Sequence, residues 1–224
     1  MKKPTLTDDL PEEMPDLSDD SLKVSFSESA QEHGGRLKPF AIAKTVDNKR
    51  RGFIDATRAN VIKGVLPRLP GKSKSIHVLV SQAFAGFDLV PHFLRLSGEK
   101  SFDSLYLTTL GFSRENLAAL GEMVGASIPP ACLKILCGDF FRRSDSGLWD
   151  IGALLAKERG FVFRSARNHT KLILAKIGGH HLVVESSANL RSCRSIETFT
   201  VSDSRDLFGF HKSWIDEVLK DADK

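Results

Sequence analysis

The sequence predicts an α/β domain in which helices pack on the faces of a central sheet. Two observations carry this prediction. From residue 75 onward, short runs rich in Val, Ile and Leu alternate with stretches whose apolar residues recur at helical spacing. Apolar residues make up 41% of the 224 residues, which is enough for a substantial core.

The expected elements follow one another along residues 75–219. Residues 75–82, SIHVLVSQ, form a continuous apolar run typical of a buried strand. The sequence predicts further strands at residues 101–110, 133–140, 161–165, 170–176, 181–185 and 196–201. It predicts helices at residues 88–96, 113–124, 148–159 and 206–219.

Three local features refine these elements. Gly178-Gly179 predicts a tight hairpin turn between the strands at 170–176 and 181–185. Ser113 is expected to cap the helix that follows it, with Asn116 in the place of the Glu or Gln that would complete a capping box. In the last helix, one apolar stripe is expected to pack on the core. Its members are Leu207, Phe210, Trp214, Ile215 and Val218.

Residues 1–74 precede this domain, which we place at residues 75–224. Residues 1–35 contain nine acidic and three basic residues without periodicity, and we expect an acidic disordered arm. Residues 36–74 form a basic transitional segment in which residues 56–66 suit a short helix. Because residues 36–224 carry 29 basic and 19 acidic residues, a net charge of +10, the domain suits a polyanionic partner.

Composition also sets the expected compartment. No apolar run reaches the roughly 18–20 residues of a membrane span. No apolar signal core follows the N-terminus, so we expect a cytoplasmic protein without a membrane partner.

Cys132, Cys137 and Cys193 form no C-x-x-C pair, which favours free thiols over disulfides or zinc. His180 and His181 are expected to be exposed hairpin residues, and no cofactor or metal is expected.

The chemistry is concentrated in the stretch between residues 168 and 189. His169 and Lys171 are two residues apart, so on a strand both side chains point to the same face. A Lys ammonium can neutralise a phosphate oxygen, and an imidazole can attack phosphorus or transfer a proton. After the glycine turn, the chain returns and brings Ser186 and Asn189 near His169. A lone H-x-K is common by chance, and the joint spacing is what favours a site over a structural histidine.

His169-Thr170-Lys171, followed by Ser186-Ser187-Ala188-Asn189, resembles the H-x-K…(G/S)-S-x-x-N signature of the phospholipase D-like superfamily. The likeness is firm over residues 164–201, only architectural over residues 75–163, and absent over residues 1–74. It is greatest to short, single-motif members from bacteria, phages and mobile elements, which include nonspecific endonucleases. The resemblance implies a mixed sheet flanked by helices on both faces. It also implies one half-site per chain, and hence a homodimer whose active site lies across the two-fold axis.

The resemblance further implies a role for each site residue. His169 would act as the nucleophile that forms a phosphohistidine, or as the acid and base in the partner half-site. Lys171 and Asn189 would hold phosphate oxygens, Ser186 would support them, and Glu197 would orient an imidazole. No metal is needed. The expected activity is therefore that of a metal-independent phosphodiesterase, and a nuclease acting on DNA or RNA ranks first.

Two residues depart from the family pattern. Lys176 stands where the family often has Asp, and Glu185 stands where a small Gly is common. These departures keep an alternative open, in which a weak or inactive member serves as a nucleic-acid-binding or structural component of a phage or mobile element. A lipid-directed phosphodiesterase ranks third, because the sequence lacks an obvious amphipathic membrane element.

Overall fold

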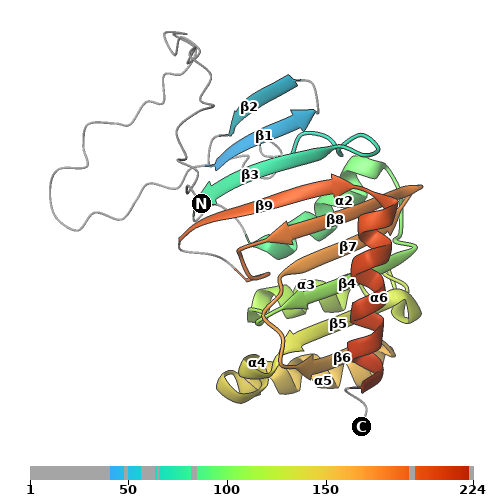
Figure 1. Cartoon of the computed structure of the whole chain (residues 1–224). Helices are drawn as coiled ribbons and strands as arrows, with labels where there is room; N and C mark the ends of the chain where they lie inside the picture. The colour runs from blue at the N-terminus through green and yellow to red at the C-terminus, as the bar shows by residue number, and fades with distance from the viewer. Residues whose placement is uncertain are drawn as a thin grey trace, which may run out of the picture. The chain divides into compact units, whose positions relative to one another are not determined.

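The structure is a computed structural model that describes residues 41–47, 50–56, 64, 66–81, 85–191 and 195–221. Within these residues, nine strands form one sheet in the order β2-β1-β3-β9-β8-β7-β4-β5-β6 (Figure 1). The strands are β1 (Ala41–Asp47), β2 (Arg50–Ala56), β3 (Ser75–Ser81), β4 (Ser104–Thr109), β5 (Leu133–Gly138), β6 (Val162–Ala166), β7 (Leu172–Ile177), β8 (His180–Ser186) and β9 (Ile196–Asp203).

The sheet is mixed because only its β4-β5-β6 end is parallel. The other neighbouring strands pair antiparallel. Parallel neighbours need a crossover connection. Helix α3 (Arg114–Met123) forms the crossover between β4 and β5. Helices α4 (Asp139–Ser144) and α5 (Ser146–Arg159) form the crossover between β5 and β6. The predicted α/β class with a mixed sheet is confirmed.

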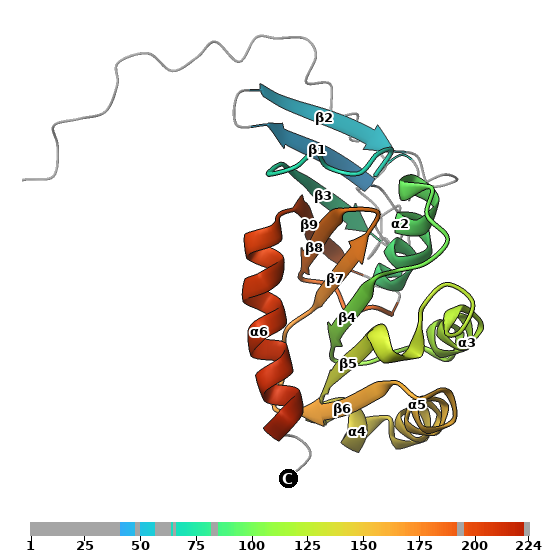
Figure 2. The same cartoon turned by 90° about the vertical axis from the view of Figure 1, so that its right-hand side faces the viewer.

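Helices cover both faces of the sheet, as predicted. Helices α2 (Leu89–Ser97), α3 and α5 lie on one face, and α6 (Arg205–Asp221) crosses the other (Figure 2). The larger core fills the space beneath α2, α3 and α5 and includes Phe93. A smaller core lies under α6, where Phe208 and Ile215 pack with Leu174 of β7. Across the described ranges, no helix is both long and apolar enough to cross a membrane.

The face of α6 that packs on the sheet differs from the predicted stripe. Its buried side chains are Phe208, His211, Ile215 and Leu219. Phe210, which the prediction placed in the core, is 63% exposed, so that assignment was wrong. The other four residues of the predicted stripe do pack on the smaller core, with Ile215 buried and Leu207, Trp214 and Val218 partly buried.

The structure also adds two strands and a complete capping box to the predicted elements. The prediction had no strands at β1 and β2, which extend the sheet beyond β3. Asn116 does complete a capping box, because its Oδ1 accepts from the Ser113 N–H at 3.3 Å and its own N–H donates to Ser113 Oγ at 3.2 Å. Residues 1–40, and with them the predicted acidic arm, lie outside the described residues, as does most of the predicted helix at 56–66.

The predicted hairpin and two of the predicted free thiols are confirmed. Gly178 and Gly179 have φ angles of 54° and 78°, the left-handed conformation that a tight two-residue turn requires. Cys137 is buried and Cys132 is partly buried, and both thiols are free. Cys193 lies outside the described residues.

Candidate functional site

The predicted site residues lie at one end of the sheet, where β7 begins and β8 ends. His169 and Lys171 stand in the connection between β6 and β7, Ser186 ends β8, and Asn189 follows it. Glu197 is the second residue of β9. Because β7 and β8 are hydrogen-bonded neighbours, the two parts of the motif lie side by side. The backbone N–H of Ser186 donates to the carbonyl of Lys171 at 3.1 Å.

His169 and Lys171 are in contact, although they do not lie on a strand as predicted. Lys171 Nζ lies 3.1 Å from His169 Nδ1 and donates to the His169 carbonyl oxygen at 2.9 Å. The strand starts later because Asn168 turns the backbone. Its Oδ1 accepts from the Thr170 N–H at 2.9 Å and from the Thr170 hydroxyl at 2.7 Å. The Thr170 hydroxyl also contacts Thr108 Oγ1 of β4 at 2.8 Å.

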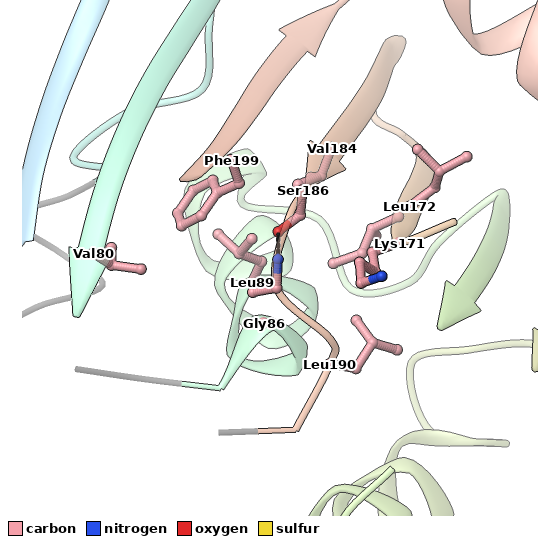
Figure 3. A pocket seen from close by; sticks show the side chains of 11 residues that line it. Val80, Gly86, Leu89, Lys171, Leu172, Val184, Ser186, Leu190 and Phe199 are labelled. Carbon is pink, nitrogen blue, oxygen red and sulfur yellow. Dashed lines mark hydrogen bonds between the residues drawn. The ribbon is translucent and has the colours of Figure 1, made fainter. Parts of the chain in front are cut away.

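Apolar side chains surround part of the Lys171 side chain. Its side chain lines a small cavity of about 20 Å³, space for about one water, beside Leu89 of α2 and Phe199 of β9 (Figure 3). Burial among these groups lowers the pKa of Lys171, and the negative charge of Glu197 acts in the opposite direction. The ammonium is thus partly stripped of water, which strengthens its attraction for an anion.

Asn189 presents a donor group because its acceptor is already used. Its Oδ1 accepts from the backbone N–H of Leu110 at 3.1 Å, just beyond the end of β4. The side-chain NH₂ is the part of the amide left to donate to a ligand. Gly86 permits this arrangement, because a Cβ there would lie 3.0 Å from the Asn189 carbonyl oxygen.

The hydroxyl of Ser186 holds the turn that leads to Asn189. It accepts from the Ala188 N–H at 2.9 Å and donates to the Thr198 carbonyl at 3.3 Å. Since its proton is used in this turn, Ser186 supports the backbone on which Asn189 stands. The supporting role toward a phosphate that the resemblance implies for Ser186 stays a prediction.

Glu197 is held by a serine. Its carboxylate accepts a short hydrogen bond from the Ser187 hydroxyl, which in turn accepts from the Thr198 N–H at 3.0 Å. In the described part of the chain, no hydrogen bond joins Glu197 to His169. Its effect on the site is electrostatic, because its negative charge partly opposes the lowering of the Lys171 pKa by burial.

His169 and Lys171 also line a larger open cleft of about 560 Å³, and a second histidine lines it with them. His211 of α6 and Trp214 face it together with His169, Lys171 and Glu185. Trp214 Nε1–H donates to His211 Nδ1 at 3.1 Å. An indole N–H can only donate, so His211 Nδ1 accepts, and its Nε2–H donates to Glu185 Oε1 at 3.3 Å.

The sequence prediction missed His211 and Trp214 as site residues. Glu185 was noted only as a departure from the family pattern. A signal existed in the last helix, where His211 occupies the buried stripe at a position that apolar residues otherwise fill. No local motif joins His211 to Glu185, because 26 positions separate them in the sequence.

The other departure, Lys176, lies far from the site. It pairs with Ser104 and His181 at the opposite end of β7. Five residues separate it from Lys171, which corresponds to roughly 16 Å along a strand. Lys176 therefore leaves the site's charge almost unchanged.

His180 and His181 are partly buried, so the expectation of exposed hairpin residues was wrong. His180 Nδ1 lies 2.7 Å from Asp203 Oδ2, and the His181 N–H donates to Asp203 Oδ1 at 2.9 Å. The His181 ring packs edge-on against Phe208 of α6. Among residues with described side chains, no three His, Cys, Asp or Glu cluster in a way that suits a metal ion.

No protein-family model matches the chain, and neither does any curated protein.

Proposed function

We propose that the protein is a metal-independent phosphodiesterase that acts on nucleic acid through a phosphohistidine. The observation that carries this proposal is the contact of Lys171 with His169 at an open cleft. A cation and an imidazole at one open cleft suit the binding and attack of a phosphodiester.

The chemistry has two steps. His169 Nε2, the ring nitrogen away from Lys171, attacks phosphorus, a P–N bond forms and the P–O bond to the leaving group breaks. A second imidazole gives the leaving oxygen its proton. That imidazole then takes a proton from water, whose oxygen attacks phosphorus, and the P–N bond breaks. Lys171 and Asn189 stabilise the negative charge on the phosphate oxygens in both steps.

The second imidazole comes from another copy of the chain in this proposal. The H-x-K motif occurs once in the sequence, and the cleft that holds His169 is open to solvent on one side. A two-fold dimer would place the partner's His169 opposite, with a second Lys171 and Asn189. We therefore also propose that the fold is phospholipase D-like and that each chain carries a single half-site.

Charge supports a polynucleotide as the substrate. Residues 36–224 carry a net charge of +10, and exposed Arg167 stands two residues before His169. Arg191, two residues after Asn189, is about half exposed and pairs with Asp145 at 3.5 Å. Exposed basic groups close in sequence to His169 and Asn189 suit the phosphates that flank a cleavage position.

The test is cleavage of DNA and RNA in EDTA by the wild type, His169→Ala and His77→Ala. His77→Ala removes an exposed imidazole two strands away from β8, so it controls for the loss of a histidine. We expect EDTA-resistant cutting by the wild type and His77→Ala, and an acid-labile phosphoprotein adduct that His169→Ala cannot form. Equal cutting by all three proteins rejects the assignment.

A second candidate function is nucleic-acid binding without turnover. Glu185 favours it, because its carboxylate places negative charge in the cleft that would receive phosphate. This function predicts binding that weakens with salt, no cutting under any condition, and no effect of His169→Ala on the bound state.

A further inference from the structure

Phe210 is exposed without a packing role in the described fold. It is 63% exposed, whereas the side chains that attach α6 to the sheet are Phe208, His211, Ile215 and Leu219. A phenyl ring left in water forgoes the stabilisation that burial provides. A large exposed apolar side chain beside a cleft is therefore a candidate contact for a ligand.

Phe210 contacts a residue that lines the cleft of the candidate site. Its ring centroid lies 5.0 Å from that of His211, which in turn lies 6.3 Å from that of Trp214. His211 and Trp214 both line the cleft with His169 and Lys171. Phe210 and Trp214 are four residues apart, so they occupy the same side of α6 on successive turns.

Two of the three rings are held in place by hydrogen bonds. Trp214 donates its N–H to His211, and His211 contacts Glu185. The indole therefore has no hydrogen-bond donor left for a ligand, and Phe210 never had one. What this cluster presents is aromatic surface, which suits a flat and largely apolar group.

We propose that Phe210 and Trp214 form a nucleobase-stacking subsite, which makes unpaired nucleic acid the preferred ligand of the cleft. The inference rests on the proposed function in taking a polynucleotide as the ligand. A phosphate near Lys171 would place its own base or a neighbouring base over α6. Base faces are available for stacking on protein only when the strand is single or the base is flipped out. Aromatic stacking accepts every base, so we expect little sequence preference.

The experiment measures binding by fluorescence anisotropy in EDTA. All proteins carry His169→Ala, so that turnover cannot interfere. Three labelled ligands of equal length are compared: a single strand, its duplex, and a strand with abasic sites in place of the central bases. The variants are Phe210→Ala, Phe210→Leu and Phe140→Ala. Phe140 is 61% exposed on α4, in the crossover between β5 and β6, so it is a matched exposed phenylalanine on a different helix.

We expect Phe210→Ala and Phe210→Leu to weaken single-strand binding about 5- to 100-fold, the effect of losing one stacked base. Duplex and abasic binding should stay unchanged, and Phe140→Ala should resemble the parent on all three ligands. Equal losses on all ligands, or no loss on the single strand, overturn the proposal. A dimer-to-monomer shift of Phe210→Ala in size-exclusion chromatography also overturns it, because Phe210 would then belong to a contact between copies.

The two proposals can fail separately. Base-dependent binding without any cutting by the wild type would retain the stacking subsite and reject the enzyme. His169-dependent cutting with equal affinity for single strand, duplex and abasic strand would retain the enzyme and reject the subsite. If the protein binds no nucleic acid at low salt, both are rejected.

Discussion

Lys171 Nζ lies 3.1 Å from His169 Nδ1. Because an ammonium only donates, Nδ1 accepts, and the neutral imidazole carries its proton on Nε2. That tautomer cannot attack phosphorus through Nε2. In the proposed reaction, a bound phosphate draws Lys171 away from Nδ1, which frees Nδ1 to take the proton. In that reaction, the contact would keep the proton on Nε2 until a phosphate binds.

Lys171→Gln should lower kcat/KM about 10²- to 10³-fold, the usual effect of removing one group that stabilises transition-state charge. Lys176→Gln removes the same charge from the opposite end of β7 and should leave kcat/KM unchanged. Steady-state kinetics on a single-stranded oligonucleotide would measure both. A similar loss in the two variants would point to general electrostatics and away from a site at Lys171.

Glu197→Gln should move the alkaline limb of the pH–activity profile to lower pH. Burial lowers the pKa of Lys171, and Glu197 partly reverses this. Without that carboxylate, the pKa of Lys171 falls further, so the ammonium is lost at a lower pH. Glu185→Gln is the matched control, since it neutralises a carboxylate in the same cleft that does not contribute to the Lys171 shift. An unmoved alkaline limb in Glu197→Gln would show that Lys171 does not set it.

Gly138→Ala should impair both halves of the site. A Cβ at Gly138 would lie 2.7 Å from the Asn168 carbonyl oxygen and 2.9 Å from Leu110 Cδ2. Asn168 precedes His169, and the Leu110 N–H holds Asn189. Such overpacking costs about 1–3 kcal/mol, which corresponds to a fall in Tm of roughly 2–10 °C.

Gly147→Ala is the control for that variant. A Cβ at this position of α5 has no neighbour within 4 Å. Thermal unfolding followed by circular dichroism, together with cleavage assays, would compare the two. Gly138→Ala with wild-type Tm and wild-type activity would contradict the close packing described for this position.

Cys137 should resist thiol reagents in the folded protein. It is fully buried, and burial raises the pKa of its thiol, so the reactive thiolate is disfavoured. With a chromogenic disulfide reagent at pH 8, Cys137 should react in the denatured wild type and stay unreacted in the native protein, which lowers the native thiol count by one. Cys137→Ser should lose that difference. Because the folded-state pKa is raised, this thiol's contribution to stability is full below its unfolded pKa of about 8.5 and declines above it.

Local patterns allowed much of the sheet to be predicted. The runs at β3, β5 and β8 are dense in Val, Ile and Leu, and the Gly-Gly turn marks the hairpin between β7 and β8. The start of β7 was misplaced because side-chain hydrogen bonds of Asn168 compete with strand pairing. Phe210 was misassigned because several overlapping stripes of α6 are apolar, and only tertiary packing selects one of them.

The candidate site was predictable only where its residues are close in sequence. His169, Lys171, Ser186 and Asn189 fall within one hairpin, so their spacing carried the information. The Leu110 N–H that fixes Asn189 and the pairing of His211 with Glu185 join segments 79 and 26 positions apart. Such contacts depend on strand order and helix rotation, which one sequence does not encode in any local pattern.

The strand order has a consequence for how the chain is made. β3 and β4 are successive strands, yet β9, β8 and β7 lie between them. A growing chain on the ribosome must therefore hold β3 and β4 apart until Asp203 has been synthesised. Until then the open edges of both strands are available to other chains. Closure through the distant β3–β9 pairing should make folding slow, and the time before it is when aggregation or chaperone binding is most probable.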